Sequence, residues 1–319
     1  MSAGGGMRAG RVTVTGASGL IGGVLVRMLR ERGVEVTIVS RDPQRAQTAL
    51  GAAGGPGLQA LAWNPTREPA PAEALRGRDA IVHLAGEQVA QRWSSGARRA
   101  IRESRVLGTR NLVDGLRALE PEARPRTLVS SSAIGYYGAH GDEPLDEETP
   151  PASDFLAQVC VAWEREASHA AELGTRTVQV RTGVVLDGGG GALAKMLPAF
   201  RLGVGGPIAG GRQYVSWVHV DDLAGMMISA IENDSWSGPV NGTAPEPVSN
   251  RAFSKALGRV LGRPALLPVP ALGLRLLFGG MAGMVTTGAR VVPAKALVLG
   301  YEFRHPALEP ALRSALASE

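Results

Sequence analysis

Residues 12–22, with the sequence VTVTGASGLIG, decide the fold because they join an apolar, β-branched run to a helix-like segment through regularly spaced glycines. Gly16, Gly19 and Gly22 stand three residues apart at this junction. Glycine is needed there for a tight turn out of a strand, for close approach of backbone N–H groups to a pyrophosphate, and for packing of the new helix on the sheet. We therefore expect a dinucleotide site, although a glycine triplet alone also fits an ordinary turn.

The segments around these glycines complete one βαβ unit: residues 11–15 and 34–39 are predicted strands and residues 20–32 a helix. Ser40 and Arg41 end the second strand, where an NAD-binding unit would carry an acid for the ribose 2′-hydroxyl. A guanidinium holds a 2′-phosphate, which a carboxylate would repel, so we predict NADP(H) rather than NAD(H). The alternative is that Arg41 is solvated and opens the next helix.

Charge and composition argue against a nucleic-acid partner. The chain of 319 residues carries 34 basic and 29 acidic residues, for a net charge of +5. Arginine provides nearly all of the positive charge, and no basic run is dense enough to predict nucleic-acid binding. The densest cluster has helical spacing and is interpreted as one solvated helix face: Arg98, Arg99, Arg102 and Arg105.

Cysteine use and hydropathy predict a cytoplasmic protein without a membrane partner. Cys160 is the single cysteine, which excludes an intramolecular disulfide and a cysteine-based metal site, and we predict no metal. Residues 1–6 lack the apolar core of a signal peptide. Residues 276–289 are apolar but glycine-rich and shorter than the roughly 20 residues that span a bilayer.

Further strand-like runs, at residues 58–62, 80–84, 127–131 and 177–186, alternate with helix-like stretches. The alternation predicts an α/β fold, a Rossmann-type doubly wound parallel sheet with helices on both faces.

The predicted domains divide near residue 187. Residues 8–186 are expected to form the NADP-binding domain, continued by elements within residues 215–245. The chain then becomes rich in glycine and proline, so residues 187–319 are expected to be mainly substrate-side, ending in a small helical cap over residues 264–319.

Ligands of such sheets bind beyond the carboxyl ends of the strands. Trp63 follows the third strand, and Leu84, Ala85 and Gly86 end the fourth, where small residues let the backbone lie against a cofactor. These residues are candidate cofactor contacts, with plain turns as the alternative.

Several motifs resemble those of the extended short-chain dehydrogenases/reductases, which include nucleotide-sugar epimerases and dehydratases. They are the segments 15–22 (TGASGLIG), 84–86 (LAG), 130–132 (SSS) and 217–222 (WVHVDD). More closely, the chain resembles an atypical branch of epimerase-family proteins of unknown substrate. That likeness is carried by the segments 132–138 (SAIGYYG), 154–160 (DFLAQVC), 213–219 (QYVSWVH) and 238–241 (GPVN).

The resemblance covers residues 8–312 and implies an extended fold with a C-terminal cap over a substrate cleft. It also implies a homodimer through a two-helix face at residues 94–119 and 154–173. The further cofactor contacts that it implies are Ser18, Leu20, Ile21, Ser130, Thr182, Gly183 and Val184.

The chemistry that the resemblance implies depends on a Tyr-x-x-x-Lys pair, in which the lysine lowers the pKa of the tyrosine and holds the nicotinamide ribose. A tyrosine with a pKa near 10 does little at neutral pH without such a cation. No lysine of this chain has a tyrosine four residues before it. If Ser132 is laid on the catalytic serine of the family, the positions of the pair fall near Leu156 and Cys160.

A second departure concerns the substrate. Val215 and Ser216 stand where many nucleotide-sugar members carry an Arg-Asp pair, so a nucleotide-sugar substrate loses support.

A proton carrier must then come from elsewhere in the chain. Ser132 and Tyr136 are the catalytic candidates, with Tyr137 as an alternative to Tyr136; tyrosines on such loops often only pack. Cys160 is interpreted as a small buried hydrophobe rather than a redox thiol.

Other polar residues of the substrate side receive structural interpretations. Asp221 is a predicted N-cap, with His219 anchoring the same helix start. Lys195 and Arg212 either hold an anion or are solvated.

We therefore expect an NADP(H)-dependent oxidoreductase or epimerase-like protein of atypical mechanism that acts on an unidentified small molecule. The alternative is a non-catalytic NADP(H)-binding protein that reports redox state to a partner.

Overall fold

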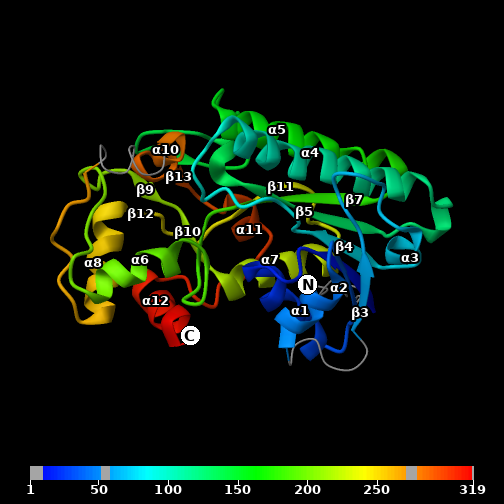
Figure 1. Ribbon diagram of the computed structural model, residues 1–319, viewed down its shortest axis with the longest axis horizontal. Helices are drawn as coiled ribbons and strands as arrows, with labels where there is room; N and C mark the ends of the chain where they lie inside the picture. Colours follow the sequence, from blue (N-terminus) through cyan, green and yellow to red (C-terminus); the bar gives the residue numbers. More distant parts are fainter. Residues whose placement is uncertain (1–9, 52–57, 271–278, 318–319) are drawn as a thin grey trace.

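A parallel sheet forms the centre of the molecule. The computed structural model describes residues 10–51, 58–270 and 279–317. Within these residues, seven strands are hydrogen-bonded in the order β11-β7-β5-β4-β1-β2-β3 (Figure 1). Every pairing in this sheet is parallel, which confirms the predicted doubly wound fold. The strand bounds are β1 Arg11–Thr15, β2 Glu35–Ser40, β3 Gln59–Ala62, β4 Ala80–His83, β5 Thr127–Ala133, β7 Arg176–Thr182 and β11 Gly238–Gly242.

Helices cover both faces of the sheet (Figure 1). One face carries α4 (Ser95–Arg117) and α5 (Phe155–Ser168), and the other carries α1 (Leu20–Glu31) and α7 (Val220–Glu232). The five inner strands are largely buried because helices cover both faces, whereas the edge strand β3 is not. Two shorter helices, α2 (Pro43–Leu50) and α3 (Ala72–Leu75), pack on opposite faces in separate hydrophobic clusters.

A second, smaller hydrophobic core belongs to the C-terminal part, on the left of Figure 1. Phe200, Trp217 and Phe253 are among its fully or almost fully buried side chains. Its helices are α6 Gly191–Arg201, α8 Asn250–Leu261 and α12 Leu308–Ala317. Two further short helices are α10 Ala282–Thr286 and α11 Ala294–Val298, of which α11 packs in the core of the main sheet through Ala296. Three pairs of short strands lie outside the main sheet: β8 Val184–Leu186 with β10 Trp217–His219, β9 Tyr214–Val215 with β12 Val248–Ser249, and β6 Pro144–Leu145 with β13 Arg290–Val291.

Two predicted elements differ from the structure. The single strand expected at residues 177–186 is two strands, β7 and β8, separated at Gly183. A Cβ atom at Gly183 would lie 2.4 Å from the carbonyl oxygen of Ser216, so the backbone of the neighbouring strand approaches too closely for a side chain.

The C-terminal region was expected to be a helical cap, but it also contributes β13, because the buried Val291 packs with Leu145 and Tyr137 on the sheet-bearing part. The predicted extension at residues 1–6 and part of the apolar segment 276–289 lie outside the described residues.

Candidate cofactor site

The turn between β1 and α1 leaves no room for side chains at two of its glycines. Gly16 has a φ of +69°, and a Cβ atom there would lie 2.8 Å from the backbone nitrogen of Ala85. A Cβ atom at Gly22 would lie 2.3 Å from the carbonyl oxygen of Gly16. The chain therefore folds back tightly on itself at the point where the strand becomes a helix, as the glycine spacing predicts.

The first turn of α1 has backbone donors to offer to a ligand. Gly19 precedes the helix, and no side chain caps it. The N–H groups at Leu20 and Ile21 belong to the set that an α-helix leaves without intrahelical partners. Ser18 is exposed beside them. An uncapped helix start with a glycine turn is a ready anion site, and the pyrophosphate of a dinucleotide fits these donors.

Hydrogen bonds fix the loop after β4 against this turn. The Leu84 N–H donates to the carbonyl oxygen of Thr15 at 3.2 Å, and the Ala85 N–H donates to Thr15 Oγ1 at 3.2 Å. The Thr15 hydroxyl lies 2.7 Å from His83 Nδ1. Burial lowers the pKa of His83 to about 4, so the ring is neutral at physiological pH and shares a hydrogen bond with the Thr15 hydroxyl. The loops that follow β1 and β4 are thus held side by side.

The residues predicted for the 2′-phosphate lie at the carboxyl end of β2. The Ser40 hydroxyl accepts a hydrogen bond from the Asp42 N–H at 3.2 Å, and the Asp42 carboxylate caps α2. Arg41 is exposed, and among the residues that the structure describes its guanidinium has no hydrogen-bond or ion-pair partner. Trp63 follows β3, but its indole is buried and donates to the carbonyl oxygen of Glu68 at 2.9 Å. Arg41 is therefore free to meet a phosphate, whereas only the backbone of Trp63 is available to a cofactor.

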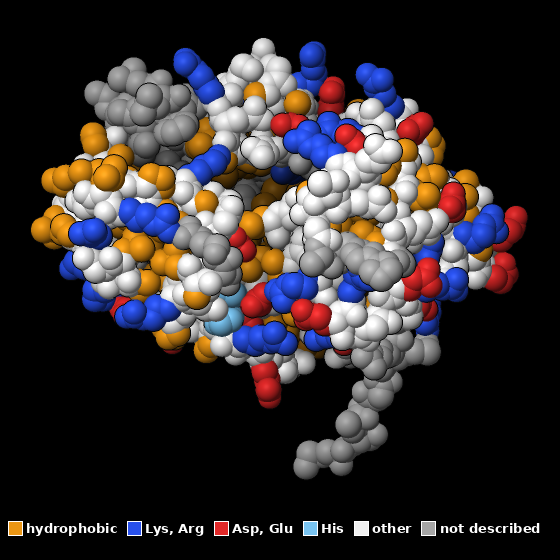
Figure 2. All heavy atoms as spheres, turned by 60° about the horizontal axis from the view of Figure 1, so that its bottom comes forward, with side chains coloured by type: hydrophobic (Ala, Val, Ile, Leu, Met, Phe, Trp, Pro, Cys, Tyr) orange, Lys and Arg blue, Asp and Glu red, His pale blue; other side chains and the backbone are white. Residues whose placement is uncertain are grey.

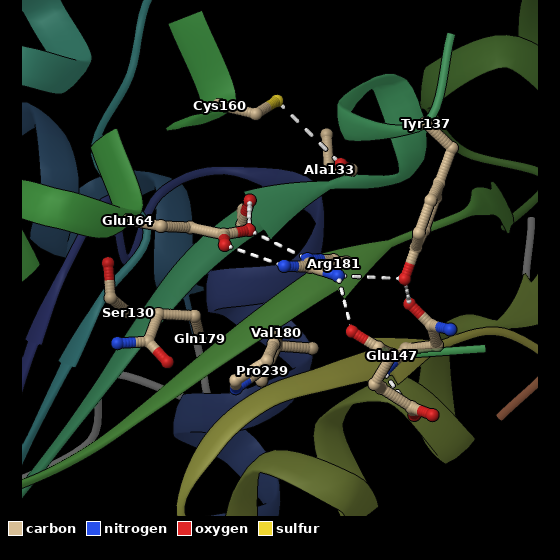
Figure 3. Close-up of polar contacts among 12 residues, drawn as sticks. Ser130, Ala133, Tyr137, Glu147, Cys160, Glu164, Gln179, Val180, Arg181 and Pro239 are labelled. Atoms are coloured by element: carbon tan, nitrogen blue, oxygen red, sulfur yellow. Dashed lines mark hydrogen bonds and ion pairs between the residues drawn. The ribbon is translucent and has the colours of Figure 1, made fainter. Parts of the chain in front are cut away.

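A buried network centred on Arg181 occupies the carboxyl ends of β5 and β7 (Figure 3). The Arg181 Nε and Nη2 atoms each donate to Glu164 at 2.9 Å, in a bidentate ion pair between β7 and α5. Nη1 donates to the Tyr137 hydroxyl at 2.9 Å, and that hydroxyl donates to Asn241 Oδ1 at 2.7 Å. Burial would lower the pKa of Arg181, but the bonds and charge of Glu164 outweigh this effect and raise it.

Both catalytic candidates touch this network. Ser132 is 2% exposed, and its hydroxyl donates to Glu164 Oε1 at 2.6 Å. The Arg181 guanidinium lies over the ring of Tyr136, 3.5 Å from its centroid, and Tyr137 packs edge-on against the same ring at 5.2 Å. Within the described part of the chain, the Tyr136 hydroxyl makes no hydrogen bond. The serine hydroxyl is thus engaged, whereas the tyrosine hydroxyl is available.

The two tyrosines pack where the two parts of the molecule meet, because they share a hydrophobic cluster with Ala289 and Val291. Figure 2 shows the surface hollowed between the sheet-bearing part on the right and the C-terminal part on the left. Residue 190 of the C-terminal part packs against the start of α1, because a Cβ atom at Gly190 would lie 2.7 Å from Leu20 Cδ1. The glycine-rich run after β8 therefore borders the helix start that offers the backbone donors.

Comparison with known proteins places this arrangement in a family. A family model described as "NAD dependent epimerase/dehydratase family" matches residues 12–241. The chain belongs to this family. A second model, "Domain of unknown function (DUF1731)", matches residues 269–315.

Curated members of the epimerase family match almost the whole chain. "Epimerase family protein SDR39U1 homolog, chloroplastic" of Arabidopsis thaliana is 39% identical over 308 residues, which is 96% of this chain and 86% of that protein. The Bacillus subtilis protein YfhF is 34% identical over 96% of this chain and 98% of its own length.

Solved structures agree with the fold. The crystal structure of human SDR39U1 with NADPH superposes with a TM-score of 0.84 at 35% identity, covering 96% of this chain and 99% of that chain. A UDP-galactose 4-epimerase structure superposes with a TM-score of 0.71 at 20% identity, covering 96% of this chain and 97% of that chain. The latter likeness concerns the fold alone.

This epimerase-family chain carries no ionisable pair at the positions where the family resemblance implies one. Leu156 packs by Gly135, since a Cβ atom at Gly135 would lie 3.4 Å from Leu156 Cβ. Cys160 is buried, and burial, followed by the charge of Glu164, raises the pKa of its thiol to about 12. The thiol is therefore neutral at physiological pH, in agreement with its interpretation as a small buried side chain.

Several other predicted contacts have polar groups that the protein already engages. The Ser130 side chain is fully buried, and its hydroxyl donates to the Ser131 carbonyl oxygen at 3.2 Å. The Gly183 N–H donates to Gly242 at 3.0 Å, and the Val184 N–H donates to Ser216 at 2.8 Å. The Thr182 hydroxyl lies 3.4 Å from the Val180 carbonyl oxygen. Contacts of these residues with a cofactor would have to use their remaining carbonyl or aliphatic atoms.

The start of α7 differs from its prediction, because His219 rather than Asp221 is the N-cap. His219 Nδ1 accepts the Asp221 N–H at 3.1 Å, and the ring stacks on His305 with centroids 3.8 Å apart. Burial and the neighbouring His305 lower the pKa of His219 to about 4. Lys195 donates to the Ala90 carbonyl oxygen at 2.9 Å, which ties α6 to the loop after β4, and Arg212 is exposed.

Sequence reasoning missed three charged residues near the site. Glu164 and Arg181 received no role, although polar residues alternate with valines in β7. Arg105 was assigned to a solvated helix face, but it is partly buried against Gly86, whose Cβ atom would lie 3.3 Å from the guanidinium carbon. Only the other three arginines of that cluster are exposed.

No helix within residues 10–51, 58–270 and 279–317 is long and apolar enough to cross a membrane. The cytoplasmic location stays a prediction, since the Arabidopsis relative is named chloroplastic.

Proposed function

We propose that this chain binds NADP(H) across the carboxyl ends of β1 and β4 and acts as an oxidoreductase or epimerase-like enzyme of atypical mechanism. The observation that carries the proposal is the turn at Gly16, packed against Ala85 beside the uncapped start of α1. Backbone donors would hold the pyrophosphate there, and Arg41 would hold the 2′-phosphate. The NADPH in the human relative's structure supports this choice of cofactor.

The proton-transfer role is assigned to Tyr136. When bound, NADPH supplies a hydride to a carbonyl carbon of the substrate. The Tyr136 hydroxyl donates its proton to the carbonyl oxygen, which yields an alcohol and a phenolate that solvent reprotonates through the hollow. Arg181 holds the tyrosine ring by its face, and Glu164, to which the Ser132 hydroxyl donates, orients Arg181. Ser132 would thus act as a positioning residue in this arrangement.

A titration with NADPH and NADH tests the cofactor. We expect tighter binding of NADPH, because NADH lacks the phosphate that Arg41 would hold. Arg41→Ala should weaken NADPH binding about tenfold or more and leave NADH binding unchanged, since a charge-assisted contact is lost only with NADPH. Arg99→Ala, which removes an exposed arginine of α4, is the control. Equal affinities of the wild-type protein for the two nucleotides would overturn the cofactor assignment.

A screen of carbonyl compounds with the NADPH-loaded protein tests the chemistry. Tyr136→Phe should abolish turnover while NADPH binding is retained, and Ser132→Ala should reduce turnover less. Turnover that neither substitution changes would remove both residues from the mechanism.

A second function, an NADP(H)-binding redox sensor without catalysis, is favoured by one observation. Leu156 and the neutral Cys160 stand where the family resemblance implies a tyrosine and a lysine. Tight NADPH binding without turnover of any carbonyl class would support the sensor.

A further inference from the structure

The Arg105 side chain is partly buried, unlike the exposed arginines of the same helix. Its guanidinium lies against Gly86 and over the ring of Trp163, with the guanidinium carbon 5.2 Å from the ring centroid. Arg98, Arg99 and Arg102 on the same helix are exposed. One arginine of the cluster is therefore turned toward the loop that follows β4.

The contacts of Arg105 leave its charge without a close counter-ion. Nη1 donates to the carbonyl oxygens of Glu87 at 3.0 Å and Ile101 at 3.2 Å. Among the described residues, no carboxylate lies within 4.0 Å of this guanidinium, and the Glu87 side chain acts on it only over a longer distance. Nε and Nη2 keep N–H donors that no described residue accepts. A partly buried cation of this kind is costly unless oxygen atoms complete its coordination.

Arg181 provides the contrast, because its Nε and Nη2 atoms both donate to the Glu164 carboxylate, and its Nη1 donates to the Tyr137 hydroxyl. A buried arginine that only stabilises the fold is paired in this way. An arginine left incompletely paired beside a ligand loop is suited to receive the ligand itself.

The position of Arg105 identifies the part of the ligand that it meets. Arg41 stands at the end of β2, on one side of the β1–β4 crossing point, and marks the adenosine half of the proposed cofactor. Gly86 follows β4, on the other side of that point. A dinucleotide that crosses the sheet edge from β2 would therefore bring its nicotinamide half to the loop at Gly86. The Arg105 guanidinium packs against this loop and donates to the Glu87 carbonyl oxygen.

We propose that Arg105 donates hydrogen bonds to the ribose hydroxyls on the nicotinamide side of NADP(H), an assignment that rests on the proposed cofactor binding. The cation comes from α4 rather than from α5, where Cys160 is a neutral thiol that can supply no charge. Cys160 lies close enough to Arg105 for the guanidinium charge to act on it. Arg105 thus supplies the positive charge that the family resemblance implies near position 160.

The proposal is tested by comparing how a substitution at Arg105 changes the affinities for two ligands. Wild type and Arg105→Met are titrated with NADPH and with 2′,5′-ADP, which carries the adenosine half and its phosphates but no nicotinamide half. We expect Arg105→Met to weaken NADPH binding about tenfold to a hundredfold, because charge-assisted hydrogen bonds are lost, and to leave 2′,5′-ADP binding unchanged. Arg105→Lys should give an intermediate NADPH affinity. Arg102→Met, one turn earlier on α4 and exposed, should change neither.

The other outcomes overturn the proposal in different ways. If wild type binds NADPH but Arg105→Met weakens both ligands equally, Arg105 has a structural role only. If the substitution changes neither affinity, the guanidinium does not touch the cofactor. Should Arg105→Met fail to fold, Arg105→Lys gives the same comparison. A wild-type protein that does not bind NADPH would overturn the proposed function itself, together with this inference.

Discussion

The carboxyl ends of β1 and β4 and those of β5 and β7 lie on one edge of the same sheet, yet they treat their polar groups differently. At β1 and β4, the helix start after Gly19 has no side-chain cap, and two nearby arginines, Arg41 after β2 and Arg105 on α4, lack close carboxylates. At β5 and β7, the Ser132 hydroxyl and the Arg181 guanidinium both donate to the Glu164 carboxylate. The carboxyl ends of β1 and β4 are therefore arranged to receive a ligand, whereas the polar groups at the ends of β5 and β7 are largely hydrogen-bonded within the protein.

The largest expected effect concerns the hydrogen-bonded network of Arg181 at the carboxyl ends of β5 and β7. Arg181→Met leaves Glu164 buried without its cation, so the free energy of unfolding should fall by about 3–5 kcal/mol. Urea unfolding measures the loss. Arg259→Met, which breaks an exposed ion pair with Glu309, should cost less than about 1 kcal/mol. Equal losses in the two variants would contradict the view that the Arg181 network stabilises the fold.

A pH dependence should follow from His83, whose ring lies 2.7 Å from the Thr15 hydroxyl and links β4 to β1. Its pKa is about 4 in the fold, below the unfolded value of about 6.5, so the folded state favours the neutral ring. This contribution is complete above about pH 6.5 and is lost as the pH falls toward 4, by about 3 kcal/mol in total. Comparison of urea unfolding at about pH 7 and about pH 4 measures it.

Variants separate His83 from the other groups that titrate in this range. His219 has a similarly lowered pKa and should supply a comparable share of the pH dependence. His83→Gln should therefore remove about one proton from the slope. An unchanged slope in His83→Gln would show that this ring is not held neutral by burial.

The glycine turn between β1 and α1 should not tolerate an added methyl group. Gly16→Ala places a Cβ atom 2.8 Å from the Ala85 nitrogen at a φ of +69°. We expect about 1–3 kcal/mol of destabilisation and at least tenfold weaker NADPH binding. Gly33→Ala is the matched control, because Gly33 has a φ of +76° and open space around it. Equal NADPH affinities of the two variants would separate the turn at Gly16 from cofactor binding.

The sequence predicts the cofactor loops after β1, β2 and β4 better than the hydrogen-bonded network at β5 and β7, for a physical reason. A glycine turn, a strand end and an arginine after β2 are local patterns, and each could be recognised from neighbouring residues. The Arg181 network joins β7 to α5 across the fold, and its only local sign is that Thr177, Gln179 and Arg181 alternate with valines in a buried strand. Partners at matching helical spacing on α5, Glu164 and Ser168, complete the pattern.

Arg105 shows a second limit of the sequence. Its spacing from Arg98 and Arg102 predicts one shared helix face, but side-chain direction depends on what packs against the helix. The small Gly86 and the flat ring of Trp163 create the space that draws the guanidinium inward. No pattern within α4 records that space.

Amide hydrogen exchange with and without NADPH tests the comparison of the two strand pairs most directly. We predict that NADPH slows exchange mainly in residues 16–22 and 84–87, and little in residues 127–133 and 176–182, whose N–H groups the sheet already engages. Bound NADPH that leaves residues 16–22 and 84–87 unprotected, or that protects the β5 and β7 segments instead, would contradict this prediction.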